Sequence, residues 1–169
     1  ETTYEKEYFS EQYKKQYGRT YLEDFDFIKK NSKHRVMEIN SAIKVSTVYK
    51  PAVLDIGCAY GPFLAAANEM GWQVFGTDIA KDAVEYVQSK LLFPAVCSSF
   101  PGFDASAEFG INKFDAVTML FVIEHFSNLK EVLSSVSNIL KEGGVFAFST
   151  PSGSGVSARY NRKSFFESS

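Results

Sequence analysis

Cysteine is scarce in this sequence, which has only Cys58 and Cys97 among its 169 residues. Cys58 follows a glycine, and Cys97 lies in a stretch with strand character, so the pair does not indicate the disulfide framework of a small secreted protein. No apolar run approaches the length of a membrane span, and the tyrosine-rich start does not resemble a signal peptide. These absences favour a protein of the reducing cytoplasm with no membrane span.

A strong charge of either sign is also absent, because the net charge is −2. The first fifty residues carry ten Lys/Arg and eight Asp/Glu, and the remainder carries eight and twelve. Neither balance is typical of a nucleic-acid-binding surface, so we expect no nucleic-acid partner. The two histidines, His34 and His125, lie far apart in the sequence, and a metal site needs several convergent ligands. We therefore predict no metal.

The most informative stretch is an apolar run that ends in an acid and then in a glycine-rich corner. Residues 53–56 form the run and predict a buried parallel strand. Gly57 and Gly61 allow a sharp turn and a close approach by a ligand, and Pro62 suits the first turn of a helix. A strand, a glycine corner and a helix form a ligand-binding unit of an open α/β sheet, with the ligand at the carboxyl end of the strand.

Two common nucleotide-binding motifs are absent from this corner. A dinucleotide-binding fingerprint needs a third glycine where Pro62 stands, and its second glycine is replaced by Ala59. No lysine follows the corner as it does in a P-loop. The run Leu-Asp-Ile-Gly-Cys-Ala-Tyr-Gly instead resembles the first motif of class I S-adenosylmethionine (SAM) methyltransferases, with Ala59 at the usual middle glycine. An NAD-type oxidoreductase is kept as an alternative that this spacing disfavours.

Asp78 supports the same resemblance. It ends the predicted second strand and follows Gly57 by about twenty residues, the distance at which an acid binds the hydroxyls of a ribose. Because NAD-binding proteins share this arrangement, Asp78 does not by itself choose SAM. A helix cap is the alternative role for the same side chain.

Two later stretches resemble the same family in the same order. Phe114–Val117, followed by Ile123–Phe126, is similar to the fourth-strand motif of small-molecule SAM methyltransferases, including those of quinone biosynthesis. Leu140–Gly144, followed by a strand that ends at Thr150 and Pro151, is similar to the fifth-strand region. The periodicity of apolar residues predicts strands over 72–77, 93–97, 113–120 and 145–150, helices over 80–90 and 128–140, and a loop over 101–112. The inward side of the helix over 128–140 is expected to consist of Leu129, Val132, Leu133, Val136 and Leu140.

The resemblance implies an α/β fold, a Rossmann-like doubly wound and mostly parallel sheet with strand order 3-2-1-4-5. We expect residues 1–50 to form an N-terminal helical extension, 51–151 the SAM-binding core and 152–169 a C-terminal tail. The family sheet normally has two further strands. The eighteen residues after Pro151 are too few for a helix and two strands, so we expect the sixth and seventh strands to be missing and the tail to be truncated.

The resemblance also implies roles for particular residues. The Gly57–Gly61 loop binds the methionine part of SAM, Asp55 holds its ammonium group, Asp78 binds the ribose, and residues 120–121 flank the sulfonium. Many family members place an acid after the third strand to bind adenine, and serines stand there in this sequence. The predicted cofactor-binding residues are Tyr17, Arg19, Asp55, Gly57, Cys58, Ala59, Tyr60, Gly61, Asp78, Ile79, Ser98, Ser99, Phe100, Leu120 and Phe121.

The N-terminal extension gives two hypotheses. Tyrosines recur at near-helical spacing as far as Tyr21, and Gly18 is expected to separate two helices. An apolar stripe from Leu22 to Ile43 predicts an amphipathic helix that packs on the sheet edge. The segment before Leu22 either packs in the same way or covers the cofactor as a lid. In the second case Arg19 is available to a carboxylate, and Tyr17 lies at the tip of the lid.

The chemistry that the resemblance implies is methyl transfer from SAM, with S-adenosylhomocysteine (SAH) as product. The protein has to hold the nucleophile, the methyl group and the sulfur in line. His125 is the candidate base for a hydroxyl acceptor, and a capping or packing histidine is the alternative. We predict methyl transfer to a small molecule, preferentially at oxygen. A SAM-binding regulatory module without turnover is the alternative from another class, and the oligomeric state is not predicted.

Overall fold

The computed structural model describes residues 13–44 and 49–152. The predictions for the tyrosines before residue 13 and for the C-terminal tail lie outside these ranges. The described elements, in chain order, are α1 (Tyr13–Tyr17), α2 (Phe25–Ala42), β1 (Ala52–Ile56), α3 (Pro62–Glu69), β2 (Gln73–Asp78), α4 (Lys81–Tyr86), the π-helical turn η2 (Val87–Leu91), β3 (Ala95–Cys97), α5 (Ala105–Phe109), β4 (Phe114–Leu120), the 3-10 turn η3 (Ile123–His125), α6 (Leu129–Ile139) and β5 (Leu140–Ser149).

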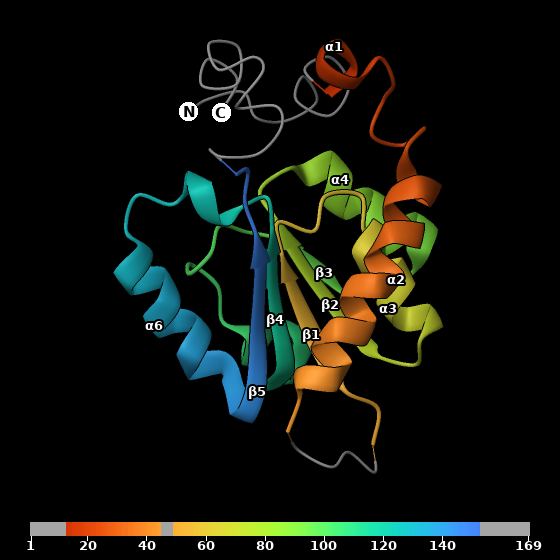
Figure 1. Ribbon diagram of the computed structural model, residues 1–169. Coiled ribbons are helices and arrows are strands. Elements are labelled where there is room, and N and C mark those ends of the chain that lie inside the picture. Colours follow the sequence, from red (N-terminus) through yellow and green to blue (C-terminus); the bar gives the residue numbers. More distant parts are fainter. Residues whose placement is uncertain (1–12, 45–48, 153–169) are drawn as a thin grey trace.

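Five strands form one sheet in the order β3-β2-β1-β4-β5, and every pair of neighbours is parallel (Figure 1). The predicted order is therefore confirmed. β1 lies in the middle, where Leu54 pairs with Phe75 of β2 and Val117 of β4. All five residues of β1 are buried, as expected for a strand covered on both faces. The carboxyl ends of the strands lie at one edge, so the residues that follow them gather there.

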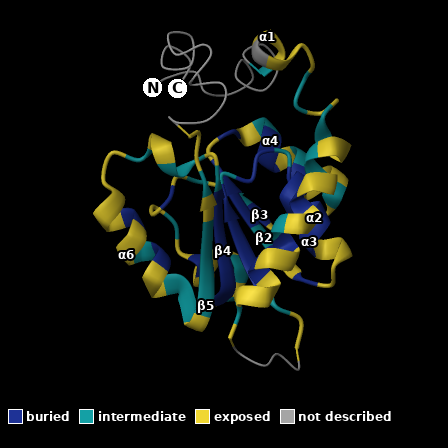
Figure 2. Cartoon of the chain, in the orientation of Figure 1, coloured by how far each residue is buried: buried dark blue, intermediate teal, exposed yellow. Residues whose placement is uncertain are grey.

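Helices cover both faces of the sheet (Figure 1). One hydrophobic cluster joins Val36 of α2, Phe63 of α3 and Val84 of α4 to β1 and β2. The second joins α5 and α6 to the other face of β1 and β4. The expected amphipathic helix is present as α2, but it packs beside α3 on a face of the sheet and not on the sheet edge. Figure 2 shows the buried strands between these two layers.

The region from α6 to β5 differs from the expectation in two ways. Val132 and Val136 of α6 are buried, whereas Leu129 and Leu133 are 46% and 47% exposed. β5 begins at Leu140, so it starts earlier than the expected range of 145–150 and includes residues 141–144. The register between β4 and β5 shifts between Phe114 and Ala116 of β4, and this irregularity accommodates the additional residues of β5.

Two shorter segments also differ. The predicted loop over 101–112 contains α5, whose N-cap Asp104 accepts hydrogen bonds from the amides of Ser106 and Ala107 at 2.8 and 3.3 Å. The predicted helix over 80–90 is α4 followed by the wider turn η2, and Ala83, Val84 and Val87 are buried as expected. Among the helices that the structure describes, none is both long and apolar enough to cross a membrane.

Candidate functional site

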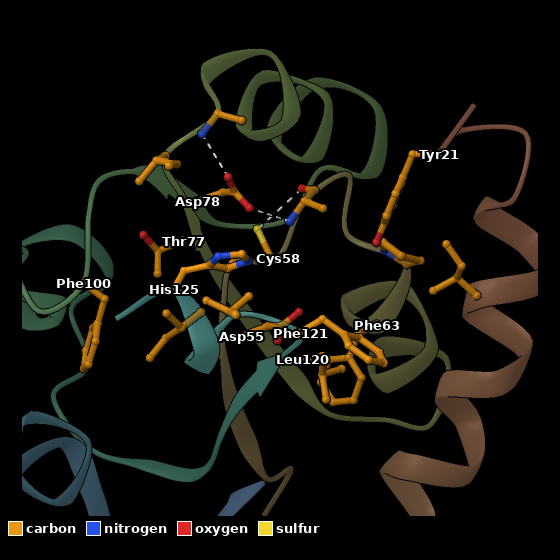
Figure 3. Close-up of a pocket in the computed structure, with 18 of the residues that line it drawn as sticks. Tyr21, Asp55, Cys58, Phe63, Thr77, Asp78, Phe100, Leu120, Phe121 and His125 are labelled. Atoms are coloured by element: carbon orange, nitrogen blue, oxygen red, sulfur yellow. Dashed lines mark hydrogen bonds between the residues drawn. The ribbon is translucent and has the colours of Figure 1, made fainter. Parts of the chain in front are cut away.

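A cavity of about 740 Å³ lies at the carboxyl edge of the sheet (Figure 3). The ends of β1, β2 and β4 form its floor, and residues of α1 and α2 contribute to its wall. A site of this size suits a small organic ligand. Its position outside the strand ends is where open α/β sheets bind their ligands.

The glycine corner after β1 is held to the end of β2 by backbone hydrogen bonds. The amides of Gly57 and Cys58 both donate to the carbonyl oxygen of Thr77, at 2.7 and 3.1 Å. Gly57 has φ = 75°, and a Cβ at this position would collide with the side chain of Val122. Ala59 also adopts a positive φ of 48°, although alanine rarely does so. Glycine is therefore required at position 57 by both the backbone conformation and the available space, whereas the positive φ of Ala59 is a strained conformation.

Asp78 fixes the other side of this corner. Its Oδ2 accepts a hydrogen bond from the amide of Ala59 at 2.8 Å, and its Oδ1 accepts one from the amide of Ala80 at 2.9 Å (Figure 3). Ala80 is itself the N-cap of α4, so Asp78 braces the turn before that helix rather than capping it. Burial raises the pKa of Asp78, and these hydrogen bonds oppose the rise. The carboxylate lines the cavity, and each oxygen has a further lone pair for a ligand.

Asp55 lies at the floor of the cavity with 2% of its surface exposed. Thr118 of β4 donates its hydroxyl to Oδ1 of Asp55 at 2.6 Å. Burial raises the pKa of Asp55 to about 7, while the Thr118 hydroxyl and the positive charge of Arg35 act in the opposite direction. The side chain is thus poised to ionise near neutral pH when a cation enters the cavity.

Most of the predicted cofactor-binding residues lie in the cavity wall. Those brought together are Tyr17, Asp55, Gly57, Cys58, Ala59, Asp78, Ile79, Ser98, Ser99, Phe100, Leu120 and Phe121, with the predicted base His125. Arg19 is not in the wall, because its guanidinium is 71% exposed and lies 3.7 Å from Asp24. Tyr60 points away from the cavity and donates its hydroxyl to Asp82 at 2.7 Å. Gly61 is the buried N-cap of α3 and is also outside the wall.

The sequence alone did not indicate three polar residues of α2 that line the cavity, Asn31, Ser32 and Arg35. Among the described residues, Arg35 forms no salt bridge, and the hydroxyl of Ser32 has no hydrogen-bond partner. The available signal was Ser32, a polar residue within the apolar stripe of this helix. A cation and a buried hydroxyl without protein partners suit a polar ligand.

A chain of tyrosine rings closes the cavity on the side of α1. Tyr13 lies 4.5 Å from Tyr17 and 5.1 Å from Tyr21, measured between ring centroids. Tyr21 continues the chain to Tyr60 at 5.9 Å, which contacts Tyr86 of α4 at 5.3 Å. Tyr13 and Tyr21 line the cavity but were not predicted as site residues. Burial, with the nearby charge of Asp55, raises the pKa of Tyr21 far above its usual value, so its hydroxyl stays protonated.

The segment after β4 forms the remaining wall. Phe121 has a positive φ of 59°, donates its amide to the carbonyl oxygen of Ser149 at 2.8 Å, and is 53% exposed. His125 ends η3 and lies in the wall with an exposed side chain. The N-cap of α6 is Asn128, whose side chain accepts a hydrogen bond from the amide of Glu131. No group of three His, Cys, Asp or Glu side chains in the described part of the chain is placed to hold a metal ion.

The sequence family that matches this chain is described as a methyltransferase domain, and the match covers residues 12–167. The chain belongs to this methyltransferase family. The predicted family, class I SAM-dependent methyltransferases, is confirmed by this match together with the strand order.

The curated relatives of this methyltransferase domain include enzymes of ubiquinone biosynthesis. The ubiquinone biosynthesis O-methyltransferase of Vibrio cholerae is 28% identical over 109 residues, which cover 63% of this chain and 44% of that protein. The enzyme of the same name from Chromobacterium violaceum is 34% identical over 103 residues, covering 58% of this chain and 43% of that protein. The chain therefore spans less than half the length of these relatives.

Solved structures share the fold of this methyltransferase domain at low sequence identity. DesVI of Streptomyces venezuelae superposes with a TM-score of 0.63 at 18% identity, over 78% of this chain and 54% of that chain. The plantazolicin methyltransferase BpumL, solved in complex with SAH, has a TM-score of 0.57 at 18% identity, over 77% of this chain and 47% of that chain. These likenesses support the fold.

Proposed function

We propose that this chain binds SAM in the cavity and transfers its methyl group to a small molecule. The observation that carries the proposal is the arrangement of Asp55 and Asp78 on either side of a glycine corner, within a cavity of about 740 Å³. SAM has an ammonium group, ribose hydroxyls and an adenine ring. Two of these groups, the ammonium and the ribose hydroxyls, donate hydrogen bonds, and one buried carboxylate faces the cavity from each of two neighbouring strands to accept them.

The two ends of the cavity differ in chemistry and suggest an orientation for SAM. Phe63 lies on the side of α2, and Phe100 lies at the opposite end (Figure 3). Ser98 and Ser99 line the cavity beside Phe100, so this end offers an aromatic ring and small polar groups to adenine. Asp55 and the α2 side then receive the amino acid end, and Asp78 receives the ribose between them.

Arg35 is the proposed partner of the methionine carboxylate, in place of the sequence-based candidate Arg19. Arg35 lies in the cavity wall, and its charge acts on Asp55. Arg19 is engaged by Asp24 outside the wall. A guanidinium without a protein anion can bind a carboxylate through two parallel hydrogen bonds, which orients the ligand as well as neutralising its charge.

When bound, SAM supplies a methyl group on a positively charged sulfur, which is a good leaving group. The protein then has to align the acceptor and exclude water. Leu120, the last residue of β4, and Phe121, which follows it, present apolar surface beside the proposed sulfonium position. His125 lies in the same wall and can accept the proton of a hydroxyl acceptor. The curated relatives are named as O-methyltransferases, which supports oxygen as the accepting atom.

The segment around α1 is proposed to act as a lid. Tyr13 and Tyr17 line the cavity, and Asp24 accepts a hydrogen bond from the Tyr13 hydroxyl at 3.1 Å. Gly18, with φ = 75° and no atom within 4 Å of a Cβ placed on it, ends α1 and lets the chain reverse. Because Tyr13 and Tyr17 lie in the cavity wall, α1 is placed to act as a lid that shields the bound cofactor from water.

Calorimetric titration with SAH, with NAD as control, tests the proposed cofactor. Micromolar binding of SAH and none of NAD is the expected result. Binding of NAD alone would contradict the proposal and revive the oxidoreductase alternative. Turnover assays with hydroxylated small molecules then separate an enzyme from a SAM-binding module. That second candidate is kept because Ser98 and Ser99 stand where many family members place the acid that binds adenine.

A further inference from the structure

Ser32 of α2 is a buried polar residue whose hydroxyl forms no hydrogen bond with the described part of the chain. Its side chain is fully buried, and its Oγ has no hydrogen-bond partner among the residues that the structure describes. Leaving a buried hydroxyl unpaired costs stability, and such groups in native proteins call for an explanation. Because Ser32 also lies in the cavity wall, a bound ligand can complete its hydrogen bonding.

The position of Ser32 indicates which part of a ligand it meets. Ser32 precedes Val36 by one helical turn, so both lie on the same face of α2. Val36 packs in one hydrophobic cluster with Phe63, which marks the α2 side of the cavity opposite Phe100 (Figure 3). Ser32 therefore lies at the end of the cavity that is proposed to receive the amino acid part of SAM.

Arg35 follows Ser32 by three residues, and side chains at this spacing are neighbours on a helix surface. The Ser32 hydroxyl is shielded from solvent, so a ligand reaches it together with a shift of the side chains around it. Arg35 forms no salt bridge within the described residues that would resist such a shift. The guanidinium of Arg35 and the hydroxyl of Ser32, one helical turn apart, can donate hydrogen bonds to the two oxygens of one carboxylate.

We propose that Ser32 is a positioning residue that donates its hydroxyl to the SAM carboxylate neutralised by Arg35. The proposal rests on the proposed function, because it requires SAM in this cavity. A hydrogen bond to a charged acceptor is stronger than one between neutral groups. Loss of the hydroxyl is therefore expected to weaken SAH binding by about tenfold. Methylthioadenosine, which has the adenosine and sulfur of SAH but no amino acid group, should bind Ser32→Ala and the wild type equally well.

The experiment compares wild type, Ser32→Ala and Ser41→Ala by calorimetric titration with SAH and with methylthioadenosine. Ser41→Ala is the matched control, because Ser41 is exposed on the same helix and donates to the carbonyl oxygen of Glu38. Thermal unfolding without ligand checks the fold. Ser32→Ala should melt at the same temperature as wild type or higher, because it removes an unpaired hydroxyl. Ser32→Cys, which fills the space of the hydroxyl with a thiol that donates only weakly, serves as a second variant if the alanine leaves a damaging void.

A tenfold loss for SAH alone, in a variant that melts normally, supports the proposal. Unchanged SAH affinity in both Ser32 variants overturns it. An equal loss for SAH and methylthioadenosine also overturns it, because a general distortion of the cavity would affect both ligands. If wild type binds neither ligand, the proposed function itself fails, and this result is distinct from a failure of Ser32 alone.

Discussion

Asp55 is a carboxylate in a position where burial opposes its charge. With a pKa raised to about 7, the folded protein holds the Asp55 proton more tightly than the unfolded chain does. The resulting stabilisation is complete below the ordinary carboxyl pKa and is lost as the pH rises through about 7. Asp55→Asn keeps an oxygen to accept the Thr118 hydroxyl and carries no charge. We expect the variant to gain stability relative to wild type between pH 4 and pH 8, by up to about 4 kcal/mol.

Urea unfolding of wild type and Asp55→Asn across this pH range measures the difference. Asp26→Asn is the control, since the Asp26 side chain is 92% exposed. A constant difference between Asp55→Asn and wild type at all pH values would contradict the raised pKa. The same titration has a functional consequence: an entering ammonium group favours the ionised carboxylate, so SAH binding near pH 7 should release a proton. Calorimetry in buffers of different ionisation enthalpy detects that release, which Asp55→Asn should abolish.

Arg35 and Arg19 give a direct comparison between two arginines of the N-terminal extension. Arg35→Ala removes a guanidinium of the cavity wall that forms no salt bridge with the described residues, and should weaken SAH binding by about tenfold or more. Arg19→Ala removes an exposed side chain at 3.7 Å from Asp24 and should change the affinity less than twofold. Calorimetric titration of both variants measures the effect. The reverse ranking would restore Arg19 as the carboxylate partner and reject the assignment of Arg35.

At the scale of the element, Asp24 in the segment after α1 is one of the side chains that contact α1, beside the ring contact of Tyr13 with Tyr21. Asp24 accepts the Tyr13 hydroxyl at 3.1 Å and lies 3.7 Å from Arg19. Asp24→Ala should let α1 open more often, so SAH should dissociate several-fold faster while the core of the domain keeps its stability. Stopped-flow displacement of SAH measures the rate, with Asp26→Ala as the exposed control. An unchanged dissociation rate would show that α1 does not act as a lid.

The elements of the sheet could be predicted from sequence, while the contents of the cavity wall could be predicted only in part. A buried parallel strand is a continuous apolar run. An acid or a glycine marks its carboxyl end, as Gly57 does after β1 and Asp78 does at the end of β2. The side of a helix that faces a cavity depends on how the helix packs. The sequence therefore could not show that α2 lies on the sheet face and places Arg35, not the earlier Arg19, in the cavity wall.

Tyr60 and Ala59 show the same limit at the glycine corner. The loop was expected to bind the cofactor along its whole length, yet Tyr60 donates to Asp82 and packs on the rings of Tyr21 and Tyr86. Local sequence cannot distinguish a tyrosine that lines the cavity from one that supports its wall. At the same corner, the bond from the Ala59 amide to Asp78 depends on the pairing of β1 with β2. This hydrogen bond joins Ala59 and Asp78, which the sequence predicted only as two separate cofactor-binding residues.

At the scale of the whole molecule, the cavity proposed for the cofactor is lined by several parts of the chain, some of which also contact one another directly. A ligand in the cavity contacts α2, the glycine corner, the end of β2 and the segment after β4 at once. Because the unfolded chain has no such site, SAH at one hundred times its dissociation constant should stabilise the domain by about 2.7 kcal/mol. We expect the melting temperature to rise by several degrees and to keep rising with SAH concentration, with no shift for NAD.

In Asp78→Ala the glycine corner loses its hydrogen bond to the end of β2, so both the melting temperature without ligand and the SAH-induced shift should fall. A normal SAH-induced shift in Asp78→Ala would mean that the ligand does not depend on the geometry of this corner.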